Sequence, residues 1–179
     1  MHHLRRTRGF TIVELMITLA LIAIVATIAV PNFTQFIRNN QLQAKAEEVK
    51  SFLLLARNEA VSNRARVKLE FKVDKNECND DSTGDCWRII RPGQANAVIR
   101  KLEYNKNQAA LAAVDTSMAT ITELFYYPSG VSSAAARLTI CNNNSPETGY
   151  LITIAANGSI RLHLRGKDED NTTALANCE

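Results

Sequence analysis

The stretch Arg8-Gly9-Phe10-Thr11-Ile12-Val13-Glu14-Leu15 decides how this chain is organised. A short basic segment ends at Gly9, and an apolar run follows from Phe10 to Val30 with Glu14 as its one charged residue. A run of about 20 apolar residues can cross a bilayer as a helix. A carboxylate within such a run is costly in lipid, so we expect Glu14 to have a functional partner.

The residues before the apolar run indicate its orientation. Arg5, Arg6 and Arg8 precede it, and positive flanks stay on the cytoplasmic side, so the chain after Val30 is predicted to be translocated. Small residues near the end of the run imitate the cleavage site of a secretory signal peptide: Ala23, Ala26 and Ala29. Such a signal has a shorter apolar core, and this run continues smoothly into a longer helix.

The basic excess of the sequence lies in the leader, Met1–Gly9. The whole chain has 21 lysines and arginines against 18 acidic residues, and the leader holds three of the basic residues and no acid. Its removal leaves 18 basic and 18 acidic residues. A positive field over the whole mature protein is therefore excluded, and a nucleic-acid site would have to be a local patch.

The stretch from Arg8 to Leu15 resembles the class III signal sequence of type IV pilins and type II secretion pseudopilins. The resemblance implies that a prepilin peptidase cuts after Gly9 and that the new N-terminal residue, Phe10, is N-methylated. It implies that Glu14 serves subunit assembly by pairing with the N-terminal amine of Phe10 on a neighbour or on its own chain. It also implies that Pro31 marks a place where the helix can loosen in a filament, although a simple kink at the membrane boundary is an equal alternative.

Residues Asn32–Arg64 predict an amphipathic helix. Charged side chains occupy most of its faces, and apolar residues recur at spacings of three and four, a pattern typical of a helix packed against a sheet. The apolar positions are Phe33, Phe36, Ile37, Leu42, Ala46, Val49, Leu53, Ala56 and Ala60. Together with Phe10–Val30 they predict one helix of about fifty residues.

After Asn63 the sequence changes to the alternation of half-buried strands, beginning at Val67–Val73. Asn105–Ser117 fits neither a helix nor a strand clearly. Further strands are expected at Trp87–Arg91, Ala97–Tyr104, Thr120–Tyr127, Arg137–Cys141, Gly149–Ala155 and Ser159–Leu164.

Two turns separate the later strands. Tyr127-Pro128-Ser129-Gly130 is expected to form one turn, and Asn157-Gly158 to form a two-residue hairpin turn. The predicted fold is α+β, with the long N-terminal helix lying across a mostly antiparallel sheet domain, and is pilin-like by resemblance.

Four cysteines in a translocated domain predict two disulfides. Three pairings are possible. We expect Cys78–Cys86, which closes a short polar loop at Asp74–Asp85, and Cys141–Cys178, which ties down the C-terminus, because local closure is easy and a free terminus frays.

The sequence shows no clear set of metal ligands or catalytic residues. Leader removal leaves His163 as the one histidine, and no cysteine spacing is a CxxC, so no metal site is expected. No nucleophile–histidine–acid set, phosphate loop or GxSxG elbow is present. We therefore expect no enzyme activity, no cofactor and no small-molecule substrate.

The last third of the chain resembles the FimT/GspH group of pilin-like proteins. The residues that carry this resemblance are Phe125–Gly130, Leu138–Cys141 and Ile152–Arg161. In that group a proline-glycine turn, a cysteine-bearing strand and a final Gly-Arg hairpin occur in this order.

The final predicted strand carries a basic row. Arg161, His163 and Arg165 fall on one face at a period of two, and Lys167 extends the row. Such a row can contact DNA phosphates, or it can be a solvated strand face. Some FimT proteins bind DNA through a Gly-Arg-x-Arg motif at this place, where this chain has Ser159 instead of the first arginine.

These features together predict three segments: a leader at 1–9, a membrane and filament-core helix at 10–30, and a periplasmic or extracellular globular domain at 31–179. We expect a minor pilin that joins major and minor pilin subunits and helps to initiate or tip a type IV pilus, with double-stranded DNA as a further partner in transformation. The expected location is the inner membrane, with the C-terminus in the periplasm, and then the surface pilus. The alternative is a GspH-like pseudopilin of a type II secretion system.

Overall fold

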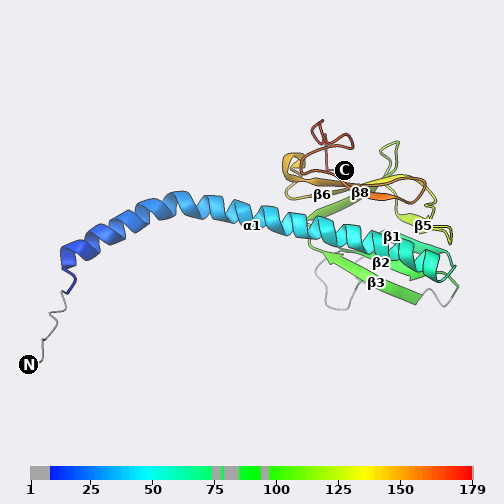
Figure 1. Ribbon diagram of the computed structural model, residues 1–179, viewed down its shortest axis with the longest axis horizontal. Coiled ribbons are helices and arrows are strands. Elements are labelled where there is room, and N and C mark those ends of the chain that lie inside the picture. The colour runs from blue at the N-terminus through cyan, green and yellow to red at the C-terminus, as the bar shows by residue number, and fades with distance from the viewer. Residues whose placement is uncertain (1–8, 74–77, 79–84, 94–96, 179) are drawn as a thin grey trace, which may run out of the picture. The chain divides into compact units, whose positions relative to one another are not determined.

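The long helix forms over the predicted length. The computed structural model describes residues 9–73, 78, 85–93 and 97–178, and α1 spans Ile12–Ser62, 51 residues (Figure 1). The chain divides into two compact units, 1–38 and 39–179, each described here by itself. The predicted single helix of about fifty residues is confirmed.

Local hydrogen bonds fix both ends of α1. At the start, the Glu14 backbone N–H donates to the Thr11 hydroxyl, while the Glu14 carboxylate accepts from the Thr11 N–H, which is a capping box. At the end, the Ala65 N–H reaches back to the Ala60 carbonyl oxygen, and the Arg64 N–H reaches that of Val61. This pair of bonds is a Schellman motif, with Arg64 in the left-handed region at φ 48°.

The second half of α1 buries the predicted stripe from Leu42 onward. The fully buried residues on the helix are Leu42, Ala46, Val49, Phe52, Leu53, Ala56 and Ala60. The prediction was wrong for Phe33, Phe36 and Ile37, which are exposed because they belong to the first unit, outside the core of the second. The three buried alanines allow the strands to approach the helix closely.

The strands form two four-stranded sheets rather than one, and every pair is antiparallel. The first has the order β3-β2-β1-β5, with β1 at Val67–Val73, β2 at Asp85–Arg91, β3 at Ala97–Tyr104 and β5 at Glu123–Tyr126. The second has the order β4-β6-β7-β8, with β4 at Ala110–Val114, β6 at Ala136–Cys141, β7 at Tyr150–Ile154 and β8 at Ile160–Leu162. A short 3-10 helix, η1, spans Pro146–Thr148.

One hydrophobic core joins the second half of α1 to the inner faces of both sheets. Trp87 of β2 is its largest buried side chain, packed edge-on against Phe71 of β1 and near Tyr104 of β3. Figure 1 shows the cyan half of α1 crossing the strands of the first sheet. The α+β fold with a helix packed on antiparallel strands is confirmed.

Three segments differ from their predictions. The ambiguous segment Asn105–Ser117 contains β4, which pairs with β6 and buries Leu111, Ala113 and Val114. The predicted strand Thr120–Tyr127 is shorter, since Thr120 bridges to Val114 and only Glu123–Tyr126 pairs with β1. The β7–β8 turn has three residues instead of two, because Ala155 pairs with Ser159 and only Gly158 has a positive φ, 78°.

Both predicted disulfides are present, Cys78–Cys86 and Cys141–Cys178. The second joins the end of β6 to the C-terminal tail. Most of the polar loop predicted at Asp74–Asp85 lies outside the described residues.

Candidate functional sites

The first half of α1 presents apolar side chains that nothing in the described chain covers. Every large hydrophobic residue from Phe10 to Val30 is at least half exposed, and none of the most apolar window is buried. The helix is long and apolar enough to cross a membrane.

Glu14 lies in the first turn of α1, where its carboxylate has partners in its own chain. The Glu14 Oε2 atom accepts hydrogen bonds from the backbone N–H of Thr11 at 2.9 Å and from its hydroxyl at 3.0 Å. The positive end of the helix dipole also favours a carboxylate there. Thr11 therefore supplies two hydrogen-bond donors to the Glu14 carboxylate within the same chain.

The other N-terminal site residues lie along the same segment. Gly9 and Phe10 are exposed and lie just before α1, separated from its first residue by Thr11. The helix continues through Pro31, although proline has no N–H to donate to the carbonyl of Thr27. One helical hydrogen bond is thus missing there, and loosening of the helix at Pro31 stays a prediction.

The two turns expected from the sequence meet each other on the surface of α1. The Arg57 Nε atom donates to the Gly130 carbonyl oxygen at 3.0 Å. A Cβ atom at Gly158 would lie 1.8 Å from that same oxygen and 3.2 Å from Arg57 Nε. The turn after β5, the β7–β8 turn and the helix therefore touch at one point, which only glycine at position 158 allows.

The predicted basic row is wrong beyond Leu162. Arg161 and Arg165 are exposed, but His163 is only 7% exposed and its Nε2 atom lies 2.8 Å from the Thr153 hydroxyl. Leu164, expected on the opposite face, is 63% exposed. The Lys167 Nζ atom donates to the Thr172 carbonyl oxygen at 2.9 Å. The four basic residues do not form one open face.

A turn that was not predicted from the sequence explains why the basic row is broken. The Lys167 N–H donates to the Leu164 carbonyl oxygen, and the Gly166 N–H donates to that of Gly149. Gly166 has φ 65°, and a Cβ there would lie 2.3 Å from the Glu147 carbonyl oxygen. The chain therefore leaves the sheet after His163 and folds back as the C-terminal tail.

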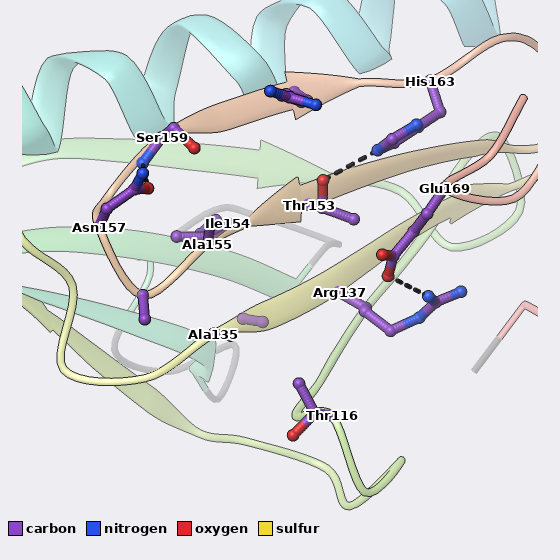
Figure 2. A pocket seen from close by; sticks show the side chains of 13 residues that line it. Thr116, Ala135, Arg137, Thr153, Ile154, Ala155, Asn157, Ser159, His163 and Glu169 are labelled. Carbon is purple, nitrogen blue, oxygen red and sulfur yellow. Dashed lines mark hydrogen bonds and ion pairs between the residues drawn. The ribbon is translucent and has the colours of Figure 1, made fainter.

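The tail is held on the second sheet by an ion-pair cluster that sequence analysis missed. Arg137 of β6 binds the carboxylate of Asp168 at 2.7 Å and also that of Glu169, the latter contact drawn in Figure 2. Burial by itself raises the pKa of Asp168, but the hydrogen bond from Arg137 and the Glu169 N–H outweigh it, so the pKa lies below its usual value. Burial lowers the pKa of Arg137, and the two carboxylates more than reverse this. The signal in the sequence was weak, because 31 residues separate Arg137 from Asp168.

Within the described residues, no group of three or more His, Cys, Asp or Glu side chains is arranged to hold a metal ion. All four cysteines are used in disulfides.

Comparison with known families assigns both parts of the chain. The family model described as type II transport protein GspH matches residues 45–158. The model of the prokaryotic N-terminal methylation motif matches residues 4–30. This motif implies processing by prepilin peptidase and assembly with pilin subunits.

A relative and two solved structures agree with these matches. A segment of 41 residues is 56% identical to the type IV major pilin protein PilA of Myxococcus xanthus; it makes up 22% of this chain and 19% of that protein, so the match spans about a fifth of the relative's length. The type IV minor pilin FimU of Pseudomonas aeruginosa is similar with a TM-score of 0.57 and 25% identity, over 80% of this chain and 99% of that one.

The minor pseudopilin EpsH of the Vibrio cholerae type 2 secretion system shares the fold, with a TM-score of 0.50 and 15% identity over 72% of this chain and 99% of that one. Since the GspH model covers more than half of the sequence, the chain belongs to the GspH family of type IV minor pilins and type II pseudopilins, which are structural subunits and not enzymes.

Proposed function

We propose that this protein is a minor pilin that helps to initiate or tip a type IV pilus. The observation that carries the proposal is the likeness to the minor pilin FimU, which extends over 80% of the chain at 25% identity. The likeness to the pseudopilin EpsH is weaker in identity, at 15%, and covers less of the chain.

The proposed route begins with the leader, residues 1–9. Prepilin peptidase cuts after Gly9, and Phe10 becomes the N-methylated first residue. Residues 10–30 hold the subunit in the inner membrane as a single span, with residues 31–179 in the periplasm, until the subunit moves into a surface pilus. Mass spectrometry of the protein isolated from its own cells tests this: a mature N-terminus other than singly methylated Phe10 would contradict it.

Glu14 is proposed to act in assembly, through its carboxylate and the N-terminal amine of Phe10 on a neighbour or on its own chain. Two opposite charges in lipid are tolerable only when paired. The variant Glu14→Ala should leave the second unit folded but reduce incorporation into sheared pili, because Glu14 lies in the first unit. Glu47→Ala, an exposed glutamate in the second unit, is the control. Equal incorporation of Glu14→Ala and wild type would refute this role.

The alternative function is that of a GspH-like pseudopilin in a type II secretion system, which the name of the matching family model favours. A deletion strain separates the two functions. Loss of surface pili with normal secretion of exoproteins supports the pilus, and the reverse supports the secretion system. Complementation with the wild-type chain excludes effects on neighbouring genes.

A contribution to DNA uptake is a second proposal, supported by the exposure of Arg161 and Arg165. It is the weaker one, because His163 is buried and the carboxylates of Asp168 and Glu169 lie on the same sheet. A gel-shift of double-stranded DNA with the mature chain at two salt concentrations tests it. No salt-sensitive shift, or a shift that survives Arg161→Ala with Arg165→Ala, would exclude double-stranded DNA as a partner.

A further inference from the structure

A cavity of about 440 Å³ lies on the outer face of the second sheet, away from the core (Figure 2). Its floor follows from the strand register. Arg137 of β6 pairs with Thr153 of β7, which pairs with Arg161 of β8, so the three side chains form one row across the sheet. All three line the cavity.

Small residues beside this row leave the space open. Just beyond the ends of these strands, two residues from Arg137, Thr153 and Arg161, stand three small residues that also line the cavity: Ala135, Ala155 and Ser159. Thr116, from the loop after β4, and Glu169, from the tail, border it on other sides, as Figure 2 shows. The hollow is thus built from the sheet, the β7–β8 turn and two loops.

The two arginines that line the cavity differ in their partners. The Arg137 guanidinium is occupied by both Asp168 and Glu169, so it is not available to a ligand. Arg161 is exposed, and among the described residues its guanidinium has no hydrogen bond or ion pair. Arg161 is therefore a cation available to a ligand, placed at the wall of a hollow and not on a flat surface.

Neutral donors surround that cation. The Asn157 Oδ1 atom accepts from the Ser159 N–H, which turns its amide and leaves the Nδ2 donor unused among the described residues. The hydroxyls of Ser159 and Thr116 are likewise without a partner in the described part of the chain. Hydroxyl and amide donors next to an arginine suit an anion rather than a cation.

His163 makes a further donor available. Its Nε2 atom lies 2.8 Å from Thr153 Oγ1, and its buried Nδ1 atom has no partner among the described residues. An unpaired buried N–H is costlier than an unpaired lone pair, so the hydrogen-bond network assigns the proton to Nε2. Nε2–H then donates to Thr153, and the Thr153 hydroxyl proton is free to be donated into the cavity.

We propose that this cavity binds a single carboxylate, supplied by an aspartate or glutamate side chain of a neighbouring pilin-like subunit. The planar guanidinium of Arg161 matches a carboxylate in a two-bond fork, with Thr153, Ser159 and Asn157 as additional donors. Only the identity of the neighbour rests on the function proposed above. Subunits in a filament lie at high local concentration, so a contact that is weak between free molecules can still be occupied there.

DNA fits this hollow less well than a carboxylate. Affinity for DNA depends on the number of phosphates that the protein neutralises, and the cavity offers one free arginine. Asp168, Glu169 and Asp170 follow nearby in the tail and oppose a polyanion, whereas a single carboxylate needs only the local pairing with Arg161.

The test is a titration of the mature full chain in non-ionic detergent micelles, followed by the ¹H–¹⁵N signals of Thr153, Ser159 and Arg161. The probes are N-acetyl-glutamate amide, its neutral isostere N-acetyl-glutamine amide, inorganic phosphate and a short DNA duplex. We expect the glutamate probe to saturate with a Kd in the low millimolar range, and the glutamine probe to cause no saturable shift. Arg161→Gln should weaken binding at least about tenfold.

Arg165→Gln is the matched control, because Arg165 is also exposed, carries the same charge and does not line the cavity. It should change the Kd by less than about twofold. The proposal is overturned by any of these results: no shift up to about 50 mM probe, equal shifts with the glutamine probe, tighter binding of phosphate than of the glutamate probe, or a DNA affinity that falls equally in both variants. Because this assay needs no pilus, its failure leaves the assembly function untouched.

Discussion

The Nε atom of Arg57 in α1 donates a 3.0 Å hydrogen bond to the backbone carbonyl oxygen of Gly130, in the turn that follows β5. The β7–β8 turn presses Gly158 against the same oxygen. Strand β5 belongs to the first sheet, and β7 and β8 belong to the second. The Gly130 carbonyl group therefore contacts the helix and lies against a turn of the second sheet, while it belongs to the turn that follows the first sheet.

Replacement of Gly158 by alanine should destabilise the folded domain strongly. The new Cβ would meet the Gly130 oxygen at 1.8 Å, and the residue would also have to hold φ 78°. We expect a loss of at least about 3 kcal/mol in the free energy of unfolding, measured by urea denaturation of the segment Asn32–Glu179. Gly93→Ala is the control, because Gly93 also has a positive φ, 94°, but has open space around its Cβ position. It should cost about 1 kcal/mol, and an equal cost in both variants would show that the close approach does not matter.

Replacement of Arg57 by methionine removes the hydrogen bond but keeps much of the apolar stem. The Gly130 carbonyl oxygen would lose its Arg57 donor while Gly158 still shields it, so the expected loss is about 1–2 kcal/mol of unfolding free energy. Arg100→Met, at an exposed arginine of β3, should change stability by less than about 0.5 kcal/mol. Comparable losses in the two variants would contradict a special role for Arg57.

The domain should lose stability in acid. The pKa values of Asp168 and Glu70 are lowered in the folded state: burial alone would raise both, but Arg137 binds the first, and Lys68 and Arg88 bind the second. A carboxyl group whose pKa is lower in the folded state than in the unfolded state stabilises the fold at pH values above its unfolded pKa. This stabilisation is lost as the pH falls through the pKa of the folded state. The melting temperature should therefore be constant near neutral pH and fall below about pH 5.

Asp168→Asn removes one of these titrating groups and should make the acid slope shallower than in the wild type. Glu147→Gln, an exposed carboxylate that pairs with no cation in the described residues, should leave the slope unchanged. Melting curves of the three proteins from about pH 7 to pH 3 decide this. Parallel curves for wild type and Asp168→Asn would show that the Arg137 cluster does not contribute.

The two disulfides should differ in their contribution to stability. Cys141–Cys178 links residues 37 apart, whereas Cys78–Cys86 links residues 8 apart. Because a longer loop loses more freedom when it is closed, paired replacement by serine should cost about 4 kcal/mol for the first and about 2.5 kcal/mol for the second. Urea denaturation of the two double variants measures both, and a larger loss at Cys78–Cys86 would reverse the expected order.

The features that local chemistry controls could be predicted from the sequence. The apolar run and the amphipathic segment together predicted one long helix, because the spacing of apolar residues depends on the local sequence and not on tertiary contacts. Strand β3 at Ala97–Tyr104 was predicted with its bounds, since both ends adjoin turn residues. The disulfide partners followed from loop closure, which depends on chain distance rather than on packing.

The candidate sites depended more on tertiary contacts. His163 was expected in an exposed row, but the strand ends before the turn at Gly166, and the imidazole is buried with its Nε2 atom beside the Thr153 hydroxyl. Arg137 had no distinguishing signal, because its partners lie in a tail that returns from far along the chain. The alternation of apolar and polar residues does not predict where a strand ends when that end is set by a backbone contact with another segment.

By itself the sequence predicted a membrane-length helix with Glu14 in its first turn and a disulfide-bonded α+β domain, because these follow from residue type and spacing, whereas cleavage of the basic leader is an expectation that rests on resemblance. Only the tertiary structure decided that the strands divide into two sheets around α1, that Gly130 and Gly158 meet at Arg57, and that Arg161 stands beside a hollow while His163 is buried. The physical reason is that a side chain's neighbours across a sheet come from register and closure, which are fixed by the packing of the whole domain and not by adjacent residues.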